Sequence, residues 1–202
     1  GNSRRANWAR QAEEATFFDL KAHVANIFAR LGIAEREITV TKADGSDNIF
    51  SASLDIATRS GKRLGVMGLV AKAQLAKADI KQPVVYAELD WGALVNLAVK
   101  KKVEFTPLSK TLPVKRDLAL LLDNAVTMAQ VEATVRESER KLLRGVELFD
   151  VYEGKNLPAG KKSYAISITL QDDEKTLQDK QIDSAMERIV ASLRKKLGAE
   201  LR

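Results

Sequence analysis

The stretch "VELFDVYEGKNLPAGKKSYAISITL", from Val146 to Leu170, contains two β-rich runs separated by a loop with Pro158 and Gly160. The second run alternates strictly, which predicts a strand with one buried face. Its apolar residues are Tyr164, Ile166, Ile168 and Leu170, and its small or polar residues are Ser163, Ala165, Ser167 and Thr169. The first run ends in a carboxylate and an aromatic side chain, Asp150 and Tyr152. We place three lysines in the loop: Lys155, Lys161 and Lys162.

The segments on either side of this hairpin complete a small domain. Val114–Asp123 alternates like a strand, with leucines on one face. Apolar residues at three- and four-residue spacing predict a helix over Thr127–Arg140, and a longer one follows the hairpin. We expect a capping box at Thr176-x-x-Asp179 and a short last strand over Ala199–Arg202. The order β-α-β-β-α-β predicts a ferredoxin-like α+β domain whose helices share one sheet face.

The first half has a different pattern. A helix with a capping box is expected over Thr16–Leu31, ended by Gly32. Further along, strand-like and helical runs alternate over 38–42, 49–58, 64–70, 72–78, 84–89 and 91–99. The basic stretch Lys100–Leu112 contains Pro107, lacks a sustained period, and is interpreted as a linker. We therefore expect an antiparallel sheet domain over residues 1–102 and a second domain over 103–202, with 103–112 as the linker.

Composition excludes several classes of site. The chain has 202 residues, no cysteine and a single histidine, so thiolate and histidine-based metal sites are excluded and no disulfide forms. It begins without Met, which indicates a piece of a longer protein. No apolar run approaches the length of a membrane span, and we expect a cytoplasmic protein that contacts no membrane. The net charge is +6, but most of the excess lies in the first half.

No set of residues forms a recognisable catalytic or metal site. His23 lies off the apolar stripe of its helix, and we interpret it as a solvated or packing residue. Gly65-Val66-Met67-Gly68 lacks the lysine and spacing of a phosphate loop, so it is interpreted as a strand in which two backbones approach closely. The run Lys100–Lys102 is a solvated linker or, alternatively, an RNA-backbone contact.

The face of the second sheet that the helices leave open is the remaining candidate site. RNA-recognition modules stack bases on such faces. Here the central strands offer small or polar residues: Lys115, Asp117 and Ala119 from one, and Ser163, Ala165 and Ser167 from the other. Tyr152 is the one candidate for stacking, and a structural role is the alternative. A regulatory or protein–protein module without RNA stays possible, whereas an acylphosphatase-type enzyme would need a glycine-rich anion loop that is missing.

The residues of the second half resemble a known family. "PVKRDLALLLD" and the stretch from Gly145 to Arg202 are similar to the C-terminal domain of bacterial phenylalanyl-tRNA synthetase β subunits. The first half resembles the preceding region more loosely, through "FFDLKAHV", "GVMGLV" and "PVVYAELDW". Ala22 replaces the usual Gly after "DLK", Leu69-Val70 replaces the usual Glu-Leu, and Thr111-Leu112-Pro113-Val114 replaces an aromatic-containing segment.

This resemblance implies both the function and the partners. The first half would be a class II synthetase-like domain without catalysis, in agreement with the lack of a Gly-x-Gly-x-x-Arg motif. The active site, with its ATP and Mg²⁺, would lie on an α subunit in an α2β2 heterotetramer, so this chain holds no cofactor, metal or catalytic residue. The second half would bind the anticodon stem-loop of tRNA(Phe). The RNA-binding residues expected from motif and loop position are Asp150, Tyr152, Ser163, Lys155, Lys161, Lys162 and Lys115.

Overall fold

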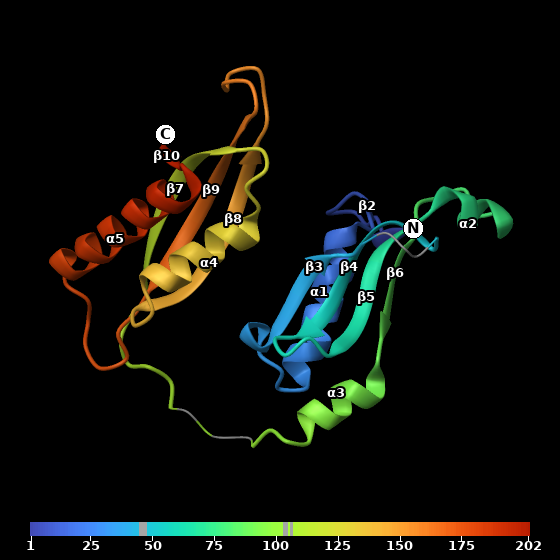
Figure 1. The fold of residues 1–202 in the computed structure, drawn as a ribbon, viewed down its shortest axis with the longest axis horizontal. Helices are drawn as coiled ribbons and strands as arrows, with labels where there is room; N and C mark the ends of the chain where they lie inside the picture. The colour runs from blue at the N-terminus through green and yellow to red at the C-terminus, as the bar shows by residue number, and fades with distance from the viewer. Residues whose placement is uncertain (45–47, 103–104, 106) are drawn as a thin grey trace. The chain divides into compact units, whose positions relative to one another are not determined.

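The computed structural model describes residues 1–44, 48–102, 105 and 107–202. It divides the chain into two compact units, Gly1–Phe105 and Thr106–Arg202 (Figure 1). Residues 103, 104 and 106 of the expected linker lie outside the described residues. Each unit has its own apolar core, so each is described by itself below.

The first unit is built on a four-stranded antiparallel sheet in the sequential order β3-β4-β5-β6. The strands span Ile38–Lys42, Phe50–Thr58, Arg63–Val70 and Val85–Leu89. Close approach of the backbones explains the two glycines of β5. A Cβ on Gly65 would lie 2.3 Å from the carbonyl oxygen of Glu88, and one on Gly68 would lie 2.4 Å from that of Ala52. The interpretation of this segment as a closely packed strand is confirmed.

Helices cover one face of this sheet. Helix α1 (Phe17–Arg30) begins at Thr16, whose hydroxyl accepts from the Asp19 backbone N–H, while the Asp19 carboxylate accepts from the Thr16 N–H; the capping box is confirmed. Val24 and Phe28 of α1 pack with Ile56, Leu64 and Met67. The smaller elements are α2 (Lys72–Lys77), α3 (Trp91–Ala98), the 3-10 turn η1 (Glu35–Glu37), and the strands β1 (Asn2–Arg4) and β2 (Glu13–Glu14).

The second unit has the expected β-α-β-β-α-β order. Its elements are β7 (Val114–Asp123), α4 (Met128–Ser138), β8 (Leu143–Tyr152), β9 (Lys161–Leu170), α5 (Asp179–Leu197) and β10 (Glu200–Leu201). The antiparallel sheet has the order β10-β7-β9-β8, so β9 is central and β8 is an edge strand. Both α4 and α5 lie against the same face, and the β8–β9 loop extends beyond the sheet (Figure 1).

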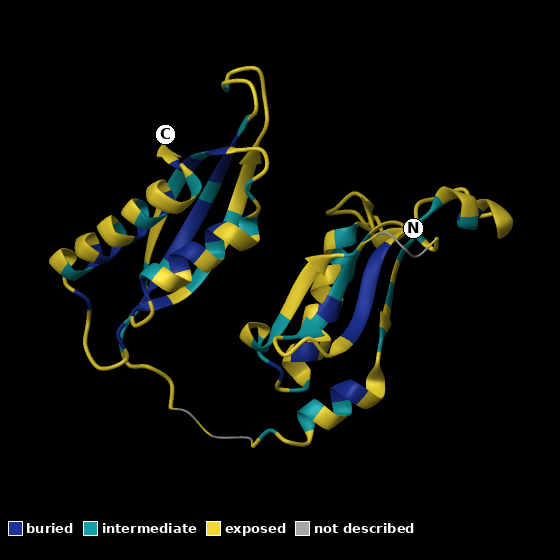
Figure 2. Ribbon diagram, in the orientation of Figure 1, coloured by how far each residue is buried: buried dark blue, intermediate teal, exposed yellow. Residues whose placement is uncertain are grey.

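The core of this unit lies between the helices and the sheet. The central strand β9 is almost continuously buried, whereas the outer sides of the helices are exposed (Figure 2). The residues of this core that are fully buried come from strands β7 and β9 and from both helices, and include Leu120, Leu122, Val131, Val135, Ile166, Ile168, Leu170, Ala185 and Ile189. The alternation of β7 and β9 therefore predicted the buried face correctly.

Two local predictions in this unit are wrong. The long helix begins after Gln178, not at Thr176, and the Gln181 side chain accepts from the Gln178 backbone N–H. Burial of Leu177 in the core holds the preceding segment against the sheet, so the helix cannot begin earlier. Lys161 and Lys162 belong to strand β9, not to the loop, because the pairing of β7 with β9 extends to Asp123 and Lys161.

Candidate functional site

A β-bulge determines which way the end of strand β8 faces. Leu148 lies opposite Ile166 on the helix-covered side. Strict alternation after Leu148 would also turn Asp150 and Tyr152 toward the helices. The register instead shifts between Leu148 and Asp150, so Phe149 is an extra residue, and Asp150 is paired with Ala165. A bulge of this kind re-aims the side chains that follow it, and here it moves Asp150 and Tyr152 to the open face.

The open face brings three of the expected site residues together. Tyr152 lies directly opposite Ser163, and Asp150 lies opposite the neighbouring Ala165. Directly opposed side chains on one face of an antiparallel pair have Cβ atoms about 4.5–5.5 Å apart. Ser163 is also paired with Leu121 of β7. Ser163 is only 7% exposed, whereas Tyr152 is 37% exposed. The aromatic ring and Asp150 are thus the accessible members of the group, and the serine lies at its base.

Two further residues define the position of the Tyr152 ring. A Cβ on Gly154 would lie 2.5 Å from both Cζ and the hydroxyl oxygen of Tyr152, so the ring tip rests where only a glycine leaves space. The guanidinium carbon of Arg202 lies 5.7 Å from the ring centroid, within the range of a cation–π contact. The tyrosine is therefore held between the start of the β8–β9 loop and an arginine from the opposite edge of the sheet.

Three of the four expected lysines keep positions from which RNA could be contacted. Lys155 lies in the exposed loop between β8 and β9. On the open face, Lys161 Nζ lies 3.0 Å from a carboxylate oxygen of Asp123, and Lys115 Nζ lies 3.8 Å from one of Glu147. Lys161 and Lys115 would have to leave these carboxylates, or share them, in order to bind a phosphate.

Lys162 does not have the position expected of a phosphate-binding loop lysine. It lies on the helix-covered side of β9 and is 7% exposed. Its amine donates to the carbonyl oxygen of Asn124 at 3.0 Å and lies 4.7 Å from the centroid of the Tyr164 ring. The misplacement follows from the loop boundary, because a strand that begins at Lys161 must turn the next side chain toward the helices.

The charges on the open face limit what it can do chemically. Acidic side chains outnumber basic ones on this face. The acidic residues are Asp117, Asp123, Glu147, Asp150 and Glu200, and the basic residues are Lys115, Lys161 and Arg202. Such a face does not attract a polyanion by charge alone. It offers instead an aromatic surface, hydrogen-bond acceptors and one planar cation, a set that can recognise an unstacked base.

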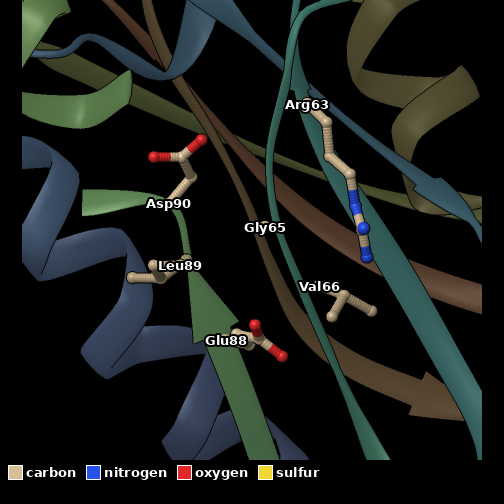
Figure 3. A pocket seen from close by; sticks show the side chains of 6 residues that line it. All are labelled: Arg63, Gly65, Val66, Glu88, Leu89 and Asp90. Carbon is tan, nitrogen blue, oxygen red and sulfur yellow. The ribbon is translucent and has the colours of Figure 1, made fainter. Parts of the chain in front are cut away.

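A cavity of about 330 Å³ in the first unit offers no comparable chemistry. It lies between β5 and β6 and is lined by Arg63, Gly65, Val66, Glu88, Leu89 and Asp90 (Figure 3). The carboxylates of Glu88 and Asp90 point in different directions (Figure 3). That of Asp90 already accepts from the Ala93 backbone N–H at 2.8 Å, where it caps α3. The lining contains no Ser, Thr, Cys, Lys or His side chain.

Two other kinds of feature, a cluster of metal ligands and a membrane-spanning helix, do not occur among the described residues. No group of three or more His, Cys, Asp or Glu residues that could hold a metal ion occurs among them. No helix in the described parts of the chain has both the length and the apolar character needed to cross a membrane.

Sequence reasoning missed Arg202, Gly154 and the bulge at Phe149. Arg202 is separated from Tyr152 by α5, and the expected last strand was the only signal that could have brought it near the sheet. Gly154 follows the strand end, where a glycine is unremarkable. One signal could have revealed the bulge. Strict alternation would place the polar Asp150 on the same buried face as Val146 and Leu148.

Comparisons with known proteins account for both units. Residues 109–202 match the model of the ferredoxin-fold anticodon binding domain, and residues 1–91 match that of the phenylalanyl tRNA synthetase beta chain CLM domain. A phenylalanine–tRNA ligase beta subunit from Porphyromonas gingivalis is 49% identical over 97% of this chain and 24% of its own length. Subunits of the same name from Bacteroides fragilis and Syntrophotalea carbinolica are 48% and 34% identical over 97% and 100% of this chain.

The chain spans about a quarter of the length of these curated relatives. The two domain models follow one another along it and together include both compact units. The model that matches residues 109–202 is that of a ferredoxin-fold domain, in agreement with the fold found here. With both of its domains and nearly its whole length matched, the chain belongs to the phenylalanine–tRNA ligase beta subunit family.

Proposed function

We propose that the second unit binds the anticodon stem-loop of tRNA(Phe), as part of a phenylalanine–tRNA ligase β subunit. The observation that carries this proposal is the grouping of Tyr152, Asp150 and Ser163 on the open face of a domain whose family is described as anticodon binding. Single-stranded loops are the part of an RNA whose bases can be unstacked and read individually by a protein.

Each residue has a separate task in this proposal. The ring of Tyr152 provides a π-face on which one unstacked base stacks. Asp150 and Ser163 provide oxygen atoms that accept from, or in the case of the serine also donate to, a base edge or a ribose 2′-hydroxyl. Lys155 in the loop, and Lys161 and Lys115 on the face, neutralise phosphates beside that base.

The charge balance of the face predicts weak binding by this chain alone. Its carboxylates outnumber its cations, and two of its lysines are already paired with acids. Reading of the anticodon would therefore depend on contacts elsewhere in the enzyme that hold the tRNA. Charge neutralisation contributes most of the affinity in nucleic-acid binding, whereas contacts with bases contribute the specificity.

The first unit is proposed to pack against a catalytic α subunit in a cytoplasmic α2β2 heterotetramer. Support comes from α1, which exposes an apolar stripe opposite its buried side: Phe18, Ala22, Ala25 and Ala29. Residues at this spacing share one helix face, and small side chains let a second helix approach closely. ATP and Mg²⁺ are proposed to bind to the α subunit.

The RNA-binding part is tested by titrating the 202-residue chain with the tRNA(Phe) anticodon stem-loop at several salt concentrations. A hairpin with the same stem and an altered anticodon is the control. We expect weaker binding to the control and a salt dependence that corresponds to few phosphate contacts. Equal affinity for both hairpins at every salt concentration would contradict the proposal and leave a module that does not read RNA.

The packing part is tested in the full-length β subunit, produced together with the α subunit. Ala25→Arg places a long charged side chain in the middle of the apolar stripe and should prevent co-purification of the two subunits. His23→Arg, on an exposed side of α1 away from the stripe, is the matched control. Unchanged assembly of the Ala25→Arg subunit would show that α1 faces solvent in the enzyme.

A further inference from the structure

Arg202 lies on the same side of the sheet as Tyr152. Strand β10 pairs with β7, and the backbone N–H of Arg202 donates to the carbonyl oxygen of Ala119 at 3.0 Å. Because Leu201 lies opposite Leu120 of the core face, the next residue faces the open side. The backbone of Arg202 is thus fixed by the sheet, and only its side chain is free to move.

The Arg202–Tyr152 contact spans the whole width of the sheet. The two residues come from the edge strands β10 and β8, with β7 and β9 between them. Three strand spacings separate their backbones by about 14 Å. Side chains rooted so far apart can meet only if both lie across the sheet toward one another. The 5.7 Å distance between the guanidinium carbon and the ring centroid therefore requires the Arg202 side chain to extend across the central strands toward the ring.

Three of the four open-face residues that the central strands place between the two side chains are small, and the fourth is Leu121, opposite Ser163. Ala119 and Ala165 are directly opposite one another on the two central strands, and Ser163 is next to Ala165 on the open face. Larger side chains at these positions would lift the arginine away from the sheet. On the far side, Gly154 leaves space for the tip of the Tyr152 ring. The open face thus contains a shallow floor with a planar cation at one end and an aromatic ring at the other.

We propose that Arg202 is a second base-contacting residue, and that its guanidinium and the Tyr152 ring form the two walls of a slot for one unstacked base. This inference rests on the proposed function, because it assigns a further residue to the same RNA-binding face. A guanidinium stacks on planar rings in a way that the compact ammonium of lysine does not. No carboxylate forms an ion pair with Arg202 within the described parts of the chain, so its charge is available to a ligand.

The spacing of the two walls fits a slot that opens on binding. Stacked bases rise by about 3.4 Å, so a base between two planar groups requires roughly 7 Å between them. The present distance of 5.7 Å is slightly shorter. Rotation about the side-chain bonds of Arg202 provides the difference while its backbone stays paired with Ala119. In the free protein the arginine covers the ring, and in the complex it moves out to cover the base.

The test is a double-mutant cycle on the 202-residue chain, with the tRNA(Phe) anticodon stem-loop as the probe. Tyr152→Ala should reduce affinity roughly 5- to 150-fold, the range for loss of one base–aromatic stack. Arg202→Ala should reduce affinity roughly 2- to 30-fold, the range from an exposed to a desolvated cation–π contact. The double variant should bind at most about twofold more weakly than whichever single variant has the lower affinity, because both residues hold the same base.

Two further variants separate the slot from simple charge attraction. Arg202→Lys keeps the charge but not the plane, so it should lose about as much affinity as Arg202→Ala. Arg194→Ala removes the same charge from the last turn of α5, on the helix side of the sheet, and should bind like the parent chain. Stem-loops with 2-aminopurine at one anticodon position should show quenched emission with the parent chain at one position, and less quenching with Arg202→Lys.

The possible outcomes distinguish this inference from the function on which it rests. Failure of the parent chain to prefer the cognate stem-loop would overturn both. Preference for the cognate stem-loop with independent effects of Tyr152→Ala and Arg202→Ala would overturn the slot alone. Full affinity of Arg202→Lys would do the same, since it would show that Arg202 acts as a point charge on a phosphate.

Discussion

The two four-stranded sheets of this chain are both antiparallel and differ in what lies on the face that the helices leave free. In each, a tyrosine on an edge strand lies opposite a small residue of the neighbouring strand: Tyr86 opposite Gly68, and Tyr152 opposite Ser163. In the first unit the tyrosine stacks on Phe50, with ring centroids 6.0 Å apart. In the second its partner is the guanidinium of Arg202.

The partner of each tyrosine determines what the face can bind. A Phe–Tyr stack is an apolar surface with one hydroxyl, which suits packing against another protein surface. A Tyr–Arg pair combines a π-face with a planar cation that carries several hydrogen-bond donors, which suits a nucleotide. The two open faces thus differ in chemistry through the partner of one tyrosine, and in the second unit that partner, Arg202, comes from a distant part of the chain.

The largest expected effect comes from breaking the aromatic pair of the first unit. A Cβ on Gly68 would lie 2.4 Å from the Ala52 carbonyl oxygen and 2.7 Å from Cδ1 of Phe50. Gly68→Ala should therefore destabilise the first unit by about 3 kcal/mol, the upper part of the usual range for overpacking, because a backbone atom must move. Tryptophan fluorescence during denaturant unfolding measures this, since both tryptophans, Trp8 and Trp91, lie in this unit.

Gly145→Ala in β8 is the control for that substitution, and its unfolding is followed by circular dichroism because the second unit contains no tryptophan. No heavy atom lies within 4 Å of a Cβ built there, so its effect on the free energy of unfolding should stay within about 0.5 kcal/mol. Equal stability of the two variants would mean that the backbone of β4 moves easily to make room for the new Cβ. The Phe50–Tyr86 stack would then not require a glycine at position 68.

The next effect tests whether the two units are stabilised separately. Glu139 is buried after α4, and its carboxylate accepts from the backbone N–H groups of Leu142 and Lys141, both at 3.1 Å, and from Arg188. Burial acts to raise its pKa, but these hydrogen bonds outweigh burial and hold the pKa below its usual value. Glu139→Gln should destabilise the second unit by about 1–3 kcal/mol at neutral pH and leave the tryptophan-monitored transition unchanged.

The contribution of Glu139 to stability depends on pH with a definite sign. A carboxyl whose pKa is lowered by folding stabilises the native state at neutral pH, and this contribution is lost as the pH falls through the lowered pKa. The difference between the parent chain and Glu139→Gln, measured by circular dichroism, should therefore shrink toward acid pH. Glu132→Gln is the control, because Glu132 forms an i,i+4 pair with Arg136 on the exposed side of α4, worth about 0.5 kcal/mol or less. An equal effect of both substitutions would contradict the assignment.

Local signals in the sequence predicted most of the fold. Thr16 and Thr127 each begin a helix with a reciprocal cap, and in both cases the apolar spacing starts directly after the cap. The same kind of signal at Thr176 was misleading, because the core contact of Leu177 overrides it. Strands β1 and β2 escaped prediction since both are short and exposed, so they carry no alternation between buried and solvated positions.

The candidate site could be predicted only in part, for a physical reason. Asp150, Tyr152 and Ser163 were found because motif and register place them on neighbouring strands. Lys162 was misplaced because strand β9 begins two residues earlier than expected, at Lys161, and alternation within the strand turns Lys162 toward the helices. Arg202 approaches Tyr152 through the pairing order β10-β7-β9-β8, and a contact between opposite edges of a sheet leaves no periodic trace in the sequence.

A smaller effect is expected when the two tyrosines are compared directly. Tyr152→Ala should weaken binding of the anticodon stem-loop by about 1–3 kcal/mol, because a stacked base loses its platform. Tyr86→Ala removes the equivalent ring from the first sheet and should leave RNA affinity unchanged. Both are measured by titration with a labelled stem-loop, together with the melting temperature of each variant. A large fall in melting temperature for Tyr152→Ala, with RNA binding unchanged, would make Tyr152 a structural residue.

The smallest effect sharpens the comparison within the second unit, between its two faces. Lys155 lies in the exposed loop, whereas Lys162 is buried on the helix side with its amine bonded to the carbonyl oxygen of Asn124. Lys155→Ala should make the plot of log affinity against log salt shallower by about 0.7–0.9 and change stability by less than about 0.5 kcal/mol, because only one phosphate contact is lost. Lys162→Ala should leave that slope unchanged and lower stability by about 1–3 kcal/mol, since the buried lysine side chain, its hydrogen bond to Asn124 and its contact with the Tyr164 ring are lost. Titrations at several salt concentrations, paired with denaturant unfolding, separate the two cases. A shallower slope for Lys162→Ala with full stability would show that this lysine reaches RNA after all, by turning out from beneath the sheet.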